Sequence, residues 1–217
     1  MPRIARVVVP GVPHHVIQRG NRRQTTFFGA WDYVLYRQLL AATCARYGVS
    51  IWSYCFLPNH VHFIAVPQEV ESLAKAFGRA HRAYSTIVNR REGWTGYLWQ
   101  GRFASYPMDD RHLLAAARYV LSNPVRAGLV DSASDWPHSS LAAHRSGASD
   151  ELVDTAPLSR RIPDWDELLG LDVAWNEANR FDRHASSGLP LGSDAFVTEL
   201  ESRTGRILRP PVASLAS

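Results

Sequence analysis

The sequence is poor in cysteine and lacks long apolar runs. Its 217 residues include only Cys44 and Cys55, so a disulfide-stabilised fold is not expected and a reducing compartment is the simplest setting. No apolar run approaches the roughly 20 residues that cross a bilayer, and the first residues lack the apolar stretch of a secretory signal. The sequence therefore predicts a cytoplasmic protein without a membrane partner.

Lysine is also nearly absent. Of the 24 Lys and Arg residues only Lys75 is lysine, and arginine suits phosphate recognition, although a GC-rich genome would give the same bias. Residues 1–150 carry a net charge of +8, whereas residues 151–217 carry −4. A basic body with a more acidic C-terminal part indicates a polyanionic partner for the body. The hydrophobic content of 46% excludes a disordered chain.

Hydrophobic periodicity and turn residues predict the order of the secondary structure. The first expected element is a strand at 7–18 that is broken by Pro10-Gly11 and Pro13 and resumes through His15. It is followed by a helix at 32–47, a hairpin of strands at 49–57 and 60–66, a helix at 71–89, a strand at 104–108 and a helix from 109 or 110 to 123. This order predicts an α+β fold, a ferredoxin-like split βαβ sandwich with an antiparallel sheet. Residues 1–147 are expected to form one domain. Residues 148–217 are expected to form a mostly helical C-terminal extension with a basic tail.

Two histidines in the second hairpin strand form the first candidate site. His60 and His62 alternate along the strand and so project from one face, where two imidazoles can hold one divalent metal ion. The alternative is a pair of partly buried histidines bonded to backbone. No Cys-x-x-Cys accompanies them, which disfavours a structural zinc site.

A tyrosine and an asparagine form the second candidate site. Tyr119 and Asn123 lie four residues apart on one helix face, together with His112, and the small Ala115 and Ala116 are expected to leave the phenol accessible. The Asn123 amide oxygen could complete a mixed nitrogen and oxygen ligand set suited to Mg²⁺ or Mn²⁺. The alternatives are a tyrosine at the core edge and an asparagine that caps the helix.

Basic and aromatic residues suggest contacts with a nucleic acid. A helix stripe and a basic turn could follow a phosphate backbone, and aromatic residues around Arg102 could stack on unpaired bases. A solvated helix face and aromatic residues that cap the core are the alternatives. The stripe is Lys75, Arg79 and Arg82; the turn contains Arg19, Arg22 and Arg23; the aromatic residues are Trp94, Tyr97, Trp99 and Phe103.

Four separated segments resemble those of the REP-associated tyrosine transposases, which belong to the single-tyrosine HUH transposase superfamily. The resemblance spans about residues 3–145 and rests on His14–Asn21, Leu57–Phe63, Leu98–Phe103 and Tyr119–Val130. It implies that residues 1–147 are a catalytic domain. It also implies a divalent metal, Mg²⁺ or Mn²⁺, as cofactor, single-stranded DNA and DNA hairpins as partners, and a monomer or homodimer.

The same resemblance implies a role for each motif residue. His60 and His62 correspond to the metal-binding pair, Tyr119 to the nucleophile and Asn123 to a residue that helps to bind the metal. The implied reaction is cleavage and transfer of single-stranded DNA near repetitive palindromic hairpins through a 5′-phosphotyrosine link.

Two other functions are compatible with parts of the sequence. A nucleic-acid-binding regulator could use the same fold without cutting, but it would leave the combined nucleophile and ligands unexplained. A barrel-type metal hydrolase of small molecules is disfavoured, because such barrels need about 250 residues.

Overall fold

The computed structural model describes residues 6–170, 181 and 183–209. Its body consists of strands and helices in the predicted order. They are β1 (His14–Arg19), η1 (Asn21–Arg23), α1 (Ala30–Tyr47), β2 (Val49–Leu57), β3 (His60–Pro67), α2 (Ser72–Glu92), β4 (Ala104–Pro107) and α3 (Asp110–Arg126). Short helices follow: η2 (Ala133–Asp135), α4 (Leu141–Ser146), α5 (Ala156–Ser159), α6 (Trp165–Gly170) and α8 (Asp194–Thr204).

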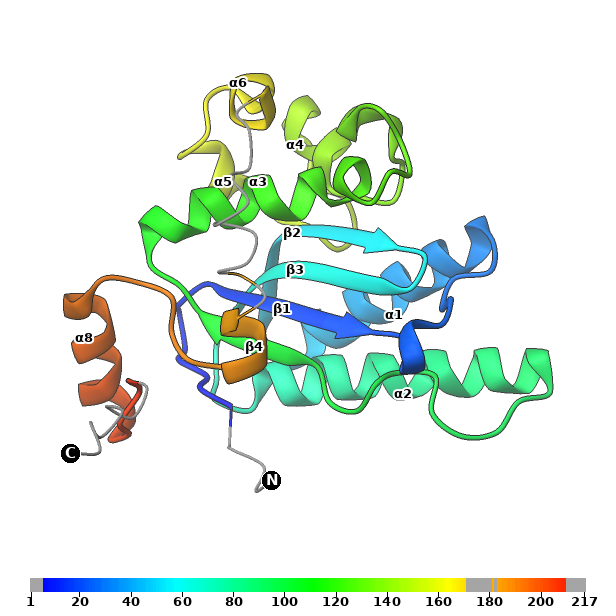
Figure 1. Ribbon diagram of the computed structural model, residues 1–217, viewed down its shortest axis with the longest axis horizontal. Coiled ribbons are helices and arrows are strands. Elements are labelled where there is room, and N and C mark those ends of the chain that lie inside the picture. The colour runs from blue at the N-terminus through cyan, green and yellow to red at the C-terminus, as the bar shows by residue number, and fades with distance from the viewer. Residues whose placement is uncertain (1–5, 171–180, 182, 210–217) are drawn as a thin grey trace, which may run out of the picture.

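The four strands form one antiparallel sheet in the order β2-β3-β1-β4. Helices α1 and α2 cover one face of the sheet, and α3 covers the other (Figure 1). This arrangement confirms the predicted α+β, ferredoxin-like split βαβ fold with a small, mostly helical C-terminal part.

Alternation along β3 divides the buried residues between two cores. Val61, Phe63 and Ala65 belong to the core shared with α1 and α2. Ile64 belongs to the core shared with α3. Since His62 lies two positions before Ile64, it points to the α3 side. The sequence period therefore places the histidine pair and α3 on the same face of the sheet.

The starts of the first strand and of the first helix differ from the sequence-based expectation. The first strand begins at His14 rather than Val7, because the preceding Pro10, Gly11 and Pro13 interrupt the extended segment. Helix α1 begins at Ala30, so Asp32 lies inside its first turn and does not cap it. Gly48 ends α1 as expected, with a φ of 64° that favours glycine.

The last core helix does not end before its proline. Helix α3 continues through Pro124 to Arg126, and its last turn is closed by hydrogen bonds from Ala127 N–H to the Asn123 carbonyl and from Leu129 N–H to the Pro124 carbonyl. Pro124 itself is buried. Packing thus outweighs the local preference of the residue before a proline for extended geometry.

The C-terminal part packs against both ends of the body. Leu158, Ile162 and Trp165 join the α3 core, and residue Val153 pairs with Ile51 of β2 in a parallel bridge. Leu200 of α8 packs on the segment before β1. The predicted helices around 165–169 and 193–203 are confirmed by α6 and α8. The division into domains at 147 and 148 stays a prediction. The basic residues of the tail are Arg203, Arg206 and Arg209, and residues 210–217 carry no charged side chain.

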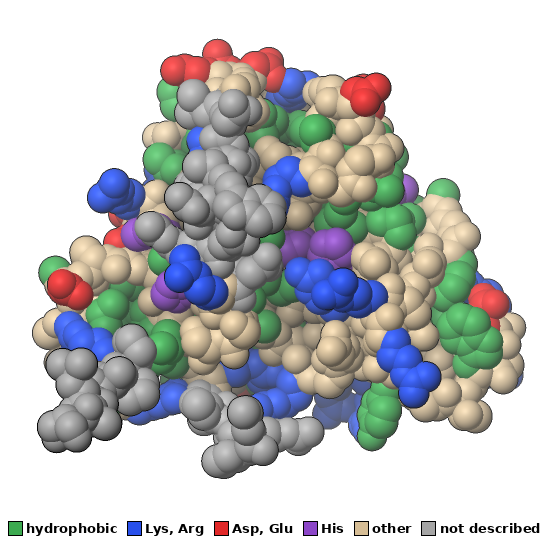
Figure 2. All heavy atoms as spheres, viewed as in Figure 1, with side chains coloured by type: hydrophobic (Ala, Val, Ile, Leu, Met, Phe, Trp, Pro, Cys, Tyr) green, Lys and Arg blue, Asp and Glu red, His purple; other side chains and the backbone are tan. Residues whose placement is uncertain are grey.

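No helix among the described residues is long and apolar enough to cross a membrane. Charge is unevenly distributed on the surface. Figure 2 shows acidic side chains mostly at the top, over α6, and Lys and Arg side chains around and below the middle of the same face.

Candidate active site

The two histidines of β3 lie at the end of the sheet nearest the β2–β3 turn. His62 is fully buried and His60 is half-buried, and their ring centroids are 5.0 Å apart in an edge-to-face arrangement. Burial, followed by the positive charge of Arg19, lowers the pKa of His60 to about 4. Burial also holds the pKa of His62 well below its usual value. Both imidazoles are therefore neutral at physiological pH, which is the form that binds a metal ion.

Each of these rings has a hydrogen-bond partner at Nδ1. His60 Nδ1 lies 2.6 Å from Oδ1 of Asn59, and His62 Nδ1 lies 3.1 Å from Nε2 of His15. His15 Nδ1 in turn lies 2.7 Å from the hydroxyl of Tyr106. The Nε2 atom of His62 is buried and has no hydrogen-bond partner. An unpartnered buried ring nitrogen is unusual and fits a ligand position.

Tyr119 extends from α3 toward this group. Its ring centroid lies 5.6 Å from that of His62 and 5.8 Å from that of His15, in edge-to-face contacts. The guanidinium of Arg126 lies 4.6 Å from the ring centroid of Tyr119. The structure thus brings the predicted nucleophile and the predicted metal-binding pair together within one chain.

The phenol was expected to be accessible, but within the described part of the chain the Tyr119 ring is covered. Tyr119 is only 3% exposed, because Phe181 of the C-terminal part packs on its ring with centroids 4.7 Å apart. Ala116 is fully buried in the α3 core. His112, expected on the same face as Tyr119, bonds through Nδ1 to the carboxylate of Asp109 at the start of α3.

Asn123 lies one helical turn after Tyr119 and is 7% exposed. Its side-chain N–H donates to the Tyr119 carbonyl at 2.8 Å, so the amide is held in one orientation. Among the described residues no three His, Cys, Asp or Glu side chains form a metal-binding cluster. A metal ion here would rely on two imidazoles and the Asn123 oxygen. This donor set fits Mn²⁺, and Mg²⁺ less closely, because Mn²⁺ tolerates imidazole better.

The basic turn adjoins the histidine pair. Arg19 is the β1 residue opposite His60, and the N–H of Gly20 donates to the Asn59 carbonyl at 2.8 Å. A side chain at Gly20 would clash with the backbone of Gln24. The loop that contains Arg102 runs alongside, through a bridge between Gly20 and Trp99. Figure 2 shows histidines near the middle of the face with Lys and Arg side chains directly below them.

Two residues of this turn adopt unusual backbone geometry. Arg22 and Arg23 have φ values of 55° and 61°, in the left-handed region that non-glycine residues rarely adopt. Both side chains are exposed. Strain of this kind persists where the surrounding structure imposes it, and it is common at functional sites.

The helix stripe lies elsewhere. Lys75, Arg79 and Arg82 are exposed on α2, on the opposite side of the sheet from α3 (Figure 1). Lys75 forms an ion pair with Glu71 one turn earlier, at 2.5 Å. The structure therefore does not bring the stripe to the histidine pair.

The aromatic stretch divides into two halves. Trp99 and Phe103 are each 5% exposed and belong to the core with α1 and α2. Trp94 is 44% and Tyr97 is 84% exposed. Only Trp94 and Tyr97 of the four expected aromatic residues are available to stack on bases.

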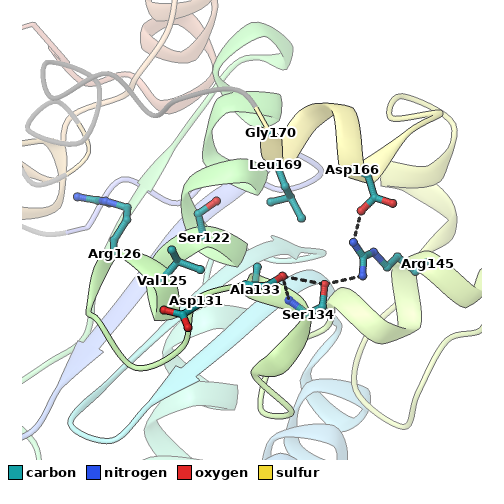
Figure 3. Close-up of a pocket in the computed structure, with 11 residues that line it drawn as sticks. Ser122, Val125, Arg126, Asp131, Ala133, Ser134, Arg145, Asp166, Leu169 and Gly170 are labelled. Atoms are coloured by element: carbon teal, nitrogen blue, oxygen red, sulfur yellow. Dashed lines mark hydrogen bonds and ion pairs between the residues drawn. The ribbon is translucent and has the colours of Figure 1, made fainter.

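A pocket of about 480 Å³ opens on the other side of Arg126, between α3, η2, α4 and α6 (Figure 3). Arg145 crosses it, donating to the hydroxyl of Ser134 and pairing with Asp166. These polar groups satisfy one another, and neither histidine of β3 lines the pocket.

Sequence reasoning did not single out His15, Asn59, Tyr106, Arg126 or Phe181. The sheet register would have identified two of them. Tyr106 is the β4 residue directly opposite His15, and His15 is diagonal to His62 across β1 and β3. Residues in such positions on one face are in reach of one another.

Comparisons with known proteins agree with this fold and these motifs. Residues 9–123 match the family described as "Transposase IS200 like". A Haemophilus influenzae protein described as a REP-associated tyrosine transposase is 27% identical over 122 residues, which are 51% of this chain and 69% of that protein. A solved structure of a REP-associated tyrosine transposase bound to a REP hairpin aligns with a TM-score of 0.56, at 21% identity, covering 71% of this chain and 93% of that one. The resemblance drawn from the sequence motifs is confirmed.

Proposed function

Since the chain belongs to the IS200-like transposase family, we propose that it cleaves and transfers single-stranded DNA through a covalent bond between Tyr119 and a 5′ phosphate. The observation that supports this most directly is the contact between the Tyr119 ring and His62, whose buried Nε2 has no hydrogen-bond partner. A tyrosine ring in contact with an imidazole whose Nε2 is available to a metal ion is suited to attack on a phosphodiester.

The proposed reaction consists of two transesterifications. The phenol oxygen of Tyr119 attacks phosphorus, the bond from phosphorus to the 3′ oxygen breaks, and the phenol proton passes to that oxygen. The products are a 5′-phosphotyrosine and a free 3′ hydroxyl. Attack by a 3′ hydroxyl on this link then reverses the step and releases the tyrosine. The number of phosphate ester bonds stays constant, so no nucleotide hydrolysis is required.

Residues around the phenol have separate tasks in this scheme. His60, His62 and Asn123 would hold a divalent metal, Mg²⁺ or Mn²⁺, as the cofactor. The metal, when bound, neutralises charge on a non-bridging phosphate oxygen and polarises phosphorus. The guanidinium of Arg126, 4.6 Å from the Tyr119 ring centroid, favours negative charge on the attacking phenol oxygen.

We propose that the DNA partner includes a hairpin of a repetitive palindrome, as in the solved structure of the REP-associated relative. The surface beside His60 is suited to the strand to be cut. It carries Arg19, Arg22, Arg23 and Arg102, with Tyr97 84% exposed on the neighbouring loop. Arginine can neutralise phosphates there, and an exposed aromatic ring can stack on an unpaired base. Lys75, Arg79 and Arg82 would contact only DNA that extends around to α2.

We assign catalysis to residues 1–147, which contain each proposed ligand and the nucleophile. The extension at 148–217 would contribute the cover of Tyr119 through Phe181. No residue of the extension takes part in the proposed reaction itself.

The proposal is tested with a labelled hairpin oligonucleotide that has a single-stranded flank, incubated with the full chain and Mn²⁺. We expect a covalent protein–DNA adduct that survives denaturation and maps to Tyr119. The Tyr119→Phe variant should give none, whereas Tyr47→Phe, on α1 across the sheet, should react like the wild type. An equal adduct from Tyr119→Phe would exclude this tyrosine as the nucleophile.

A non-cleaving regulator on the same fold is the competing function. It predicts a shift of the hairpin in a gel without any adduct under every metal condition. The barrel-type metal hydrolase is excluded, since the described residues form an open four-stranded antiparallel sheet.

A further inference from the structure

The Nδ1 atoms of both β3 histidines are occupied by groups with no assigned role. The side-chain amide of Asn59 has a fixed orientation, because its Nδ2 donates a hydrogen bond to the Arg23 carbonyl at 3.2 Å. Its Oδ1 therefore faces His60 Nδ1 at 2.6 Å and can only accept. The proton of the neutral His60 ring must then lie on Nδ1. Its Nε2 carries a lone pair.

His62 is held by a row of side chains that crosses three strands. Tyr106 on β4, His15 on β1 and His62 on β3 are linked by contacts of 2.7 Å and 3.1 Å. All three are fully buried. Water therefore cannot replace a lost partner cheaply, and the protons along the row must follow one consistent direction.

Only two directions are possible for the neutral row. In one, His62 donates from Nδ1 to His15, and His15 donates from Nδ1 to the Tyr106 oxygen. In the other, Tyr106 donates to His15, His15 donates to His62, and the His62 proton lies on Nε2. The second direction buries an N–H donor without a partner, because His62 Nε2 contacts no acceptor. The first direction leaves a lone pair at that atom.

We propose that Asn59 and the His15–Tyr106 pair are positioning residues that fix the tautomers of His60 and His62, so that both Nε2 atoms present lone pairs to one divalent metal ion. The inference rests on the proposed metal site and deepens it. Outer partners of this kind orient metal-binding histidines and raise their basicity. They act through the ligands and touch neither the metal nor the DNA.

The first test measures Mn²⁺ binding to the full chain without DNA, from the electron paramagnetic resonance signal of free Mn²⁺. His15→Phe and Asn59→Leu remove an acceptor, and each should weaken binding by about tenfold or more. Tyr106→Phe should weaken it less, because His15 stays in place. Asn59→Asp keeps an oxygen acceptor and should restore binding.

A matched control separates positioning from general loss of stability. Tyr84→Phe removes a hydroxyl from an equally buried tyrosine, which donates to the Thr26 carbonyl at 2.6 Å on the opposite side of the sheet. We expect Tyr84→Phe to lower the unfolding temperature about as much as Tyr106→Phe while leaving Mn²⁺ affinity unchanged. Equal affinities for wild type, His15→Phe and Asn59→Leu would overturn the inference.

The second test identifies the tautomers directly in metal-free protein. Long-range ¹H–¹⁵N correlation spectra of histidine-labelled protein distinguish a proton on Nδ1 from one on Nε2. We expect Nδ1–H for both His60 and His62, and a shift of His62 toward Nε2–H in His15→Phe. A wild-type His62 protonated on Nε2 would contradict the inference even if metal binds.

The two proposals fail in different ways. If wild type and His60→Ala both leave Mn²⁺ free, the metal-dependent function is wrong, whatever the tautomers are. If wild type binds Mn²⁺, His60→Ala does not, and the outer variants bind like wild type, only the positioning inference is wrong.

Discussion

The histidines of the candidate site are neutral at physiological pH. Burial lowers the pKa of His15 to about 3 and that of His60 to about 4, so neither titrates within the physiological range. These groups are therefore unsuited to sense pH or to act as cationic acids. Their hydrogen-bonding directions, rather than their charges, are what the fold controls.

A charged pair elsewhere gives a pH-dependent prediction. Burial raises the pKa of the Asp32 carboxyl, but hydrogen bonds from Arg91 and from the Phe28 N–H outweigh it and hold the pKa below its usual value. A lowered folded-state pKa adds stability that is complete above the unfolded-state pKa and lost as the pH falls through the folded-state pKa. We expect Asp32→Asn to lower the free energy of unfolding by about 1 kcal/mol at pH 7, and by less below pH 3.

Urea unfolding of both proteins at a series of pH values measures this difference. Glu92→Gln is the control, because Glu92 accepts from the same Arg91 but is exposed. Its effect should be smaller at pH 7. A wild-type advantage over Asp32→Asn that grows as the pH falls would contradict the assigned pair.

Single residues also show where sequence reasoning reached its limit. The spacing of His60 and His62, and of Tyr119 and Asn123, was sufficient to place each pair on one face. Nothing in the sequence indicates that His15 reaches His62, because this depends on the register of β1 against β3. The burial of Tyr119 under Phe181 was equally hidden, since it depends on a contact between distant segments.

At the scale of elements, the basic turn η1 and the helix α2 are alternative surfaces for DNA. The turn adjoins His60, whereas α2 lies across the sheet from α3 (Figure 1). We expect a paired substitution of Arg22 and Arg23 to weaken hairpin binding and to reduce the salt slope of the binding constant by about one unit per arginine. Asparagine is the substitute to use, because it tolerates positive φ.

The matched variant carries Arg79→Ala and Arg82→Ala on α2. It removes the same charge. With a short hairpin, the salt slope of its DNA-binding constant should stay closer to that of the wild type. A larger slope change from the α2 variant would assign DNA binding to that helix and exclude the turn as the main contact.

Element order was predictable because α2 and α3 carry their apolar residues at helical spacing and turn residues such as Gly48 separate the other elements. The residues at which elements begin and end were harder to predict. The expectation that α3 ends before Pro124 was wrong, because Pro124 is accommodated as a buried residue while backbone hydrogen bonds close the last turn. Local preference decides an end only where packing does not.

At the scale of the whole molecule, one chain contains the complete candidate site. The Tyr119 ring contacts His62 of the same chain, and on this ground we propose that the tyrosine acts without a partner subunit. We expect a mixture of Tyr119→Phe and His60→Ala proteins to form no covalent DNA adduct. Each variant lacks one part of the site, and neither can supply the other. Adduct formation by the mixture would show that the tyrosine acts across a dimer.

The row from Tyr106 through His15 to His62 has a consequence for the life of the protein in the cell. Its members lie on strands β4, β1 and β3, and the tyrosine that they serve lies later still, on α3. A chain still emerging from the ribosome has histidines in disordered surroundings and no nucleophile beside them. Under the proposed function, the capacity to cleave DNA would therefore arise only after synthesis has passed α3 and the strands β4, β1 and β3 have aligned.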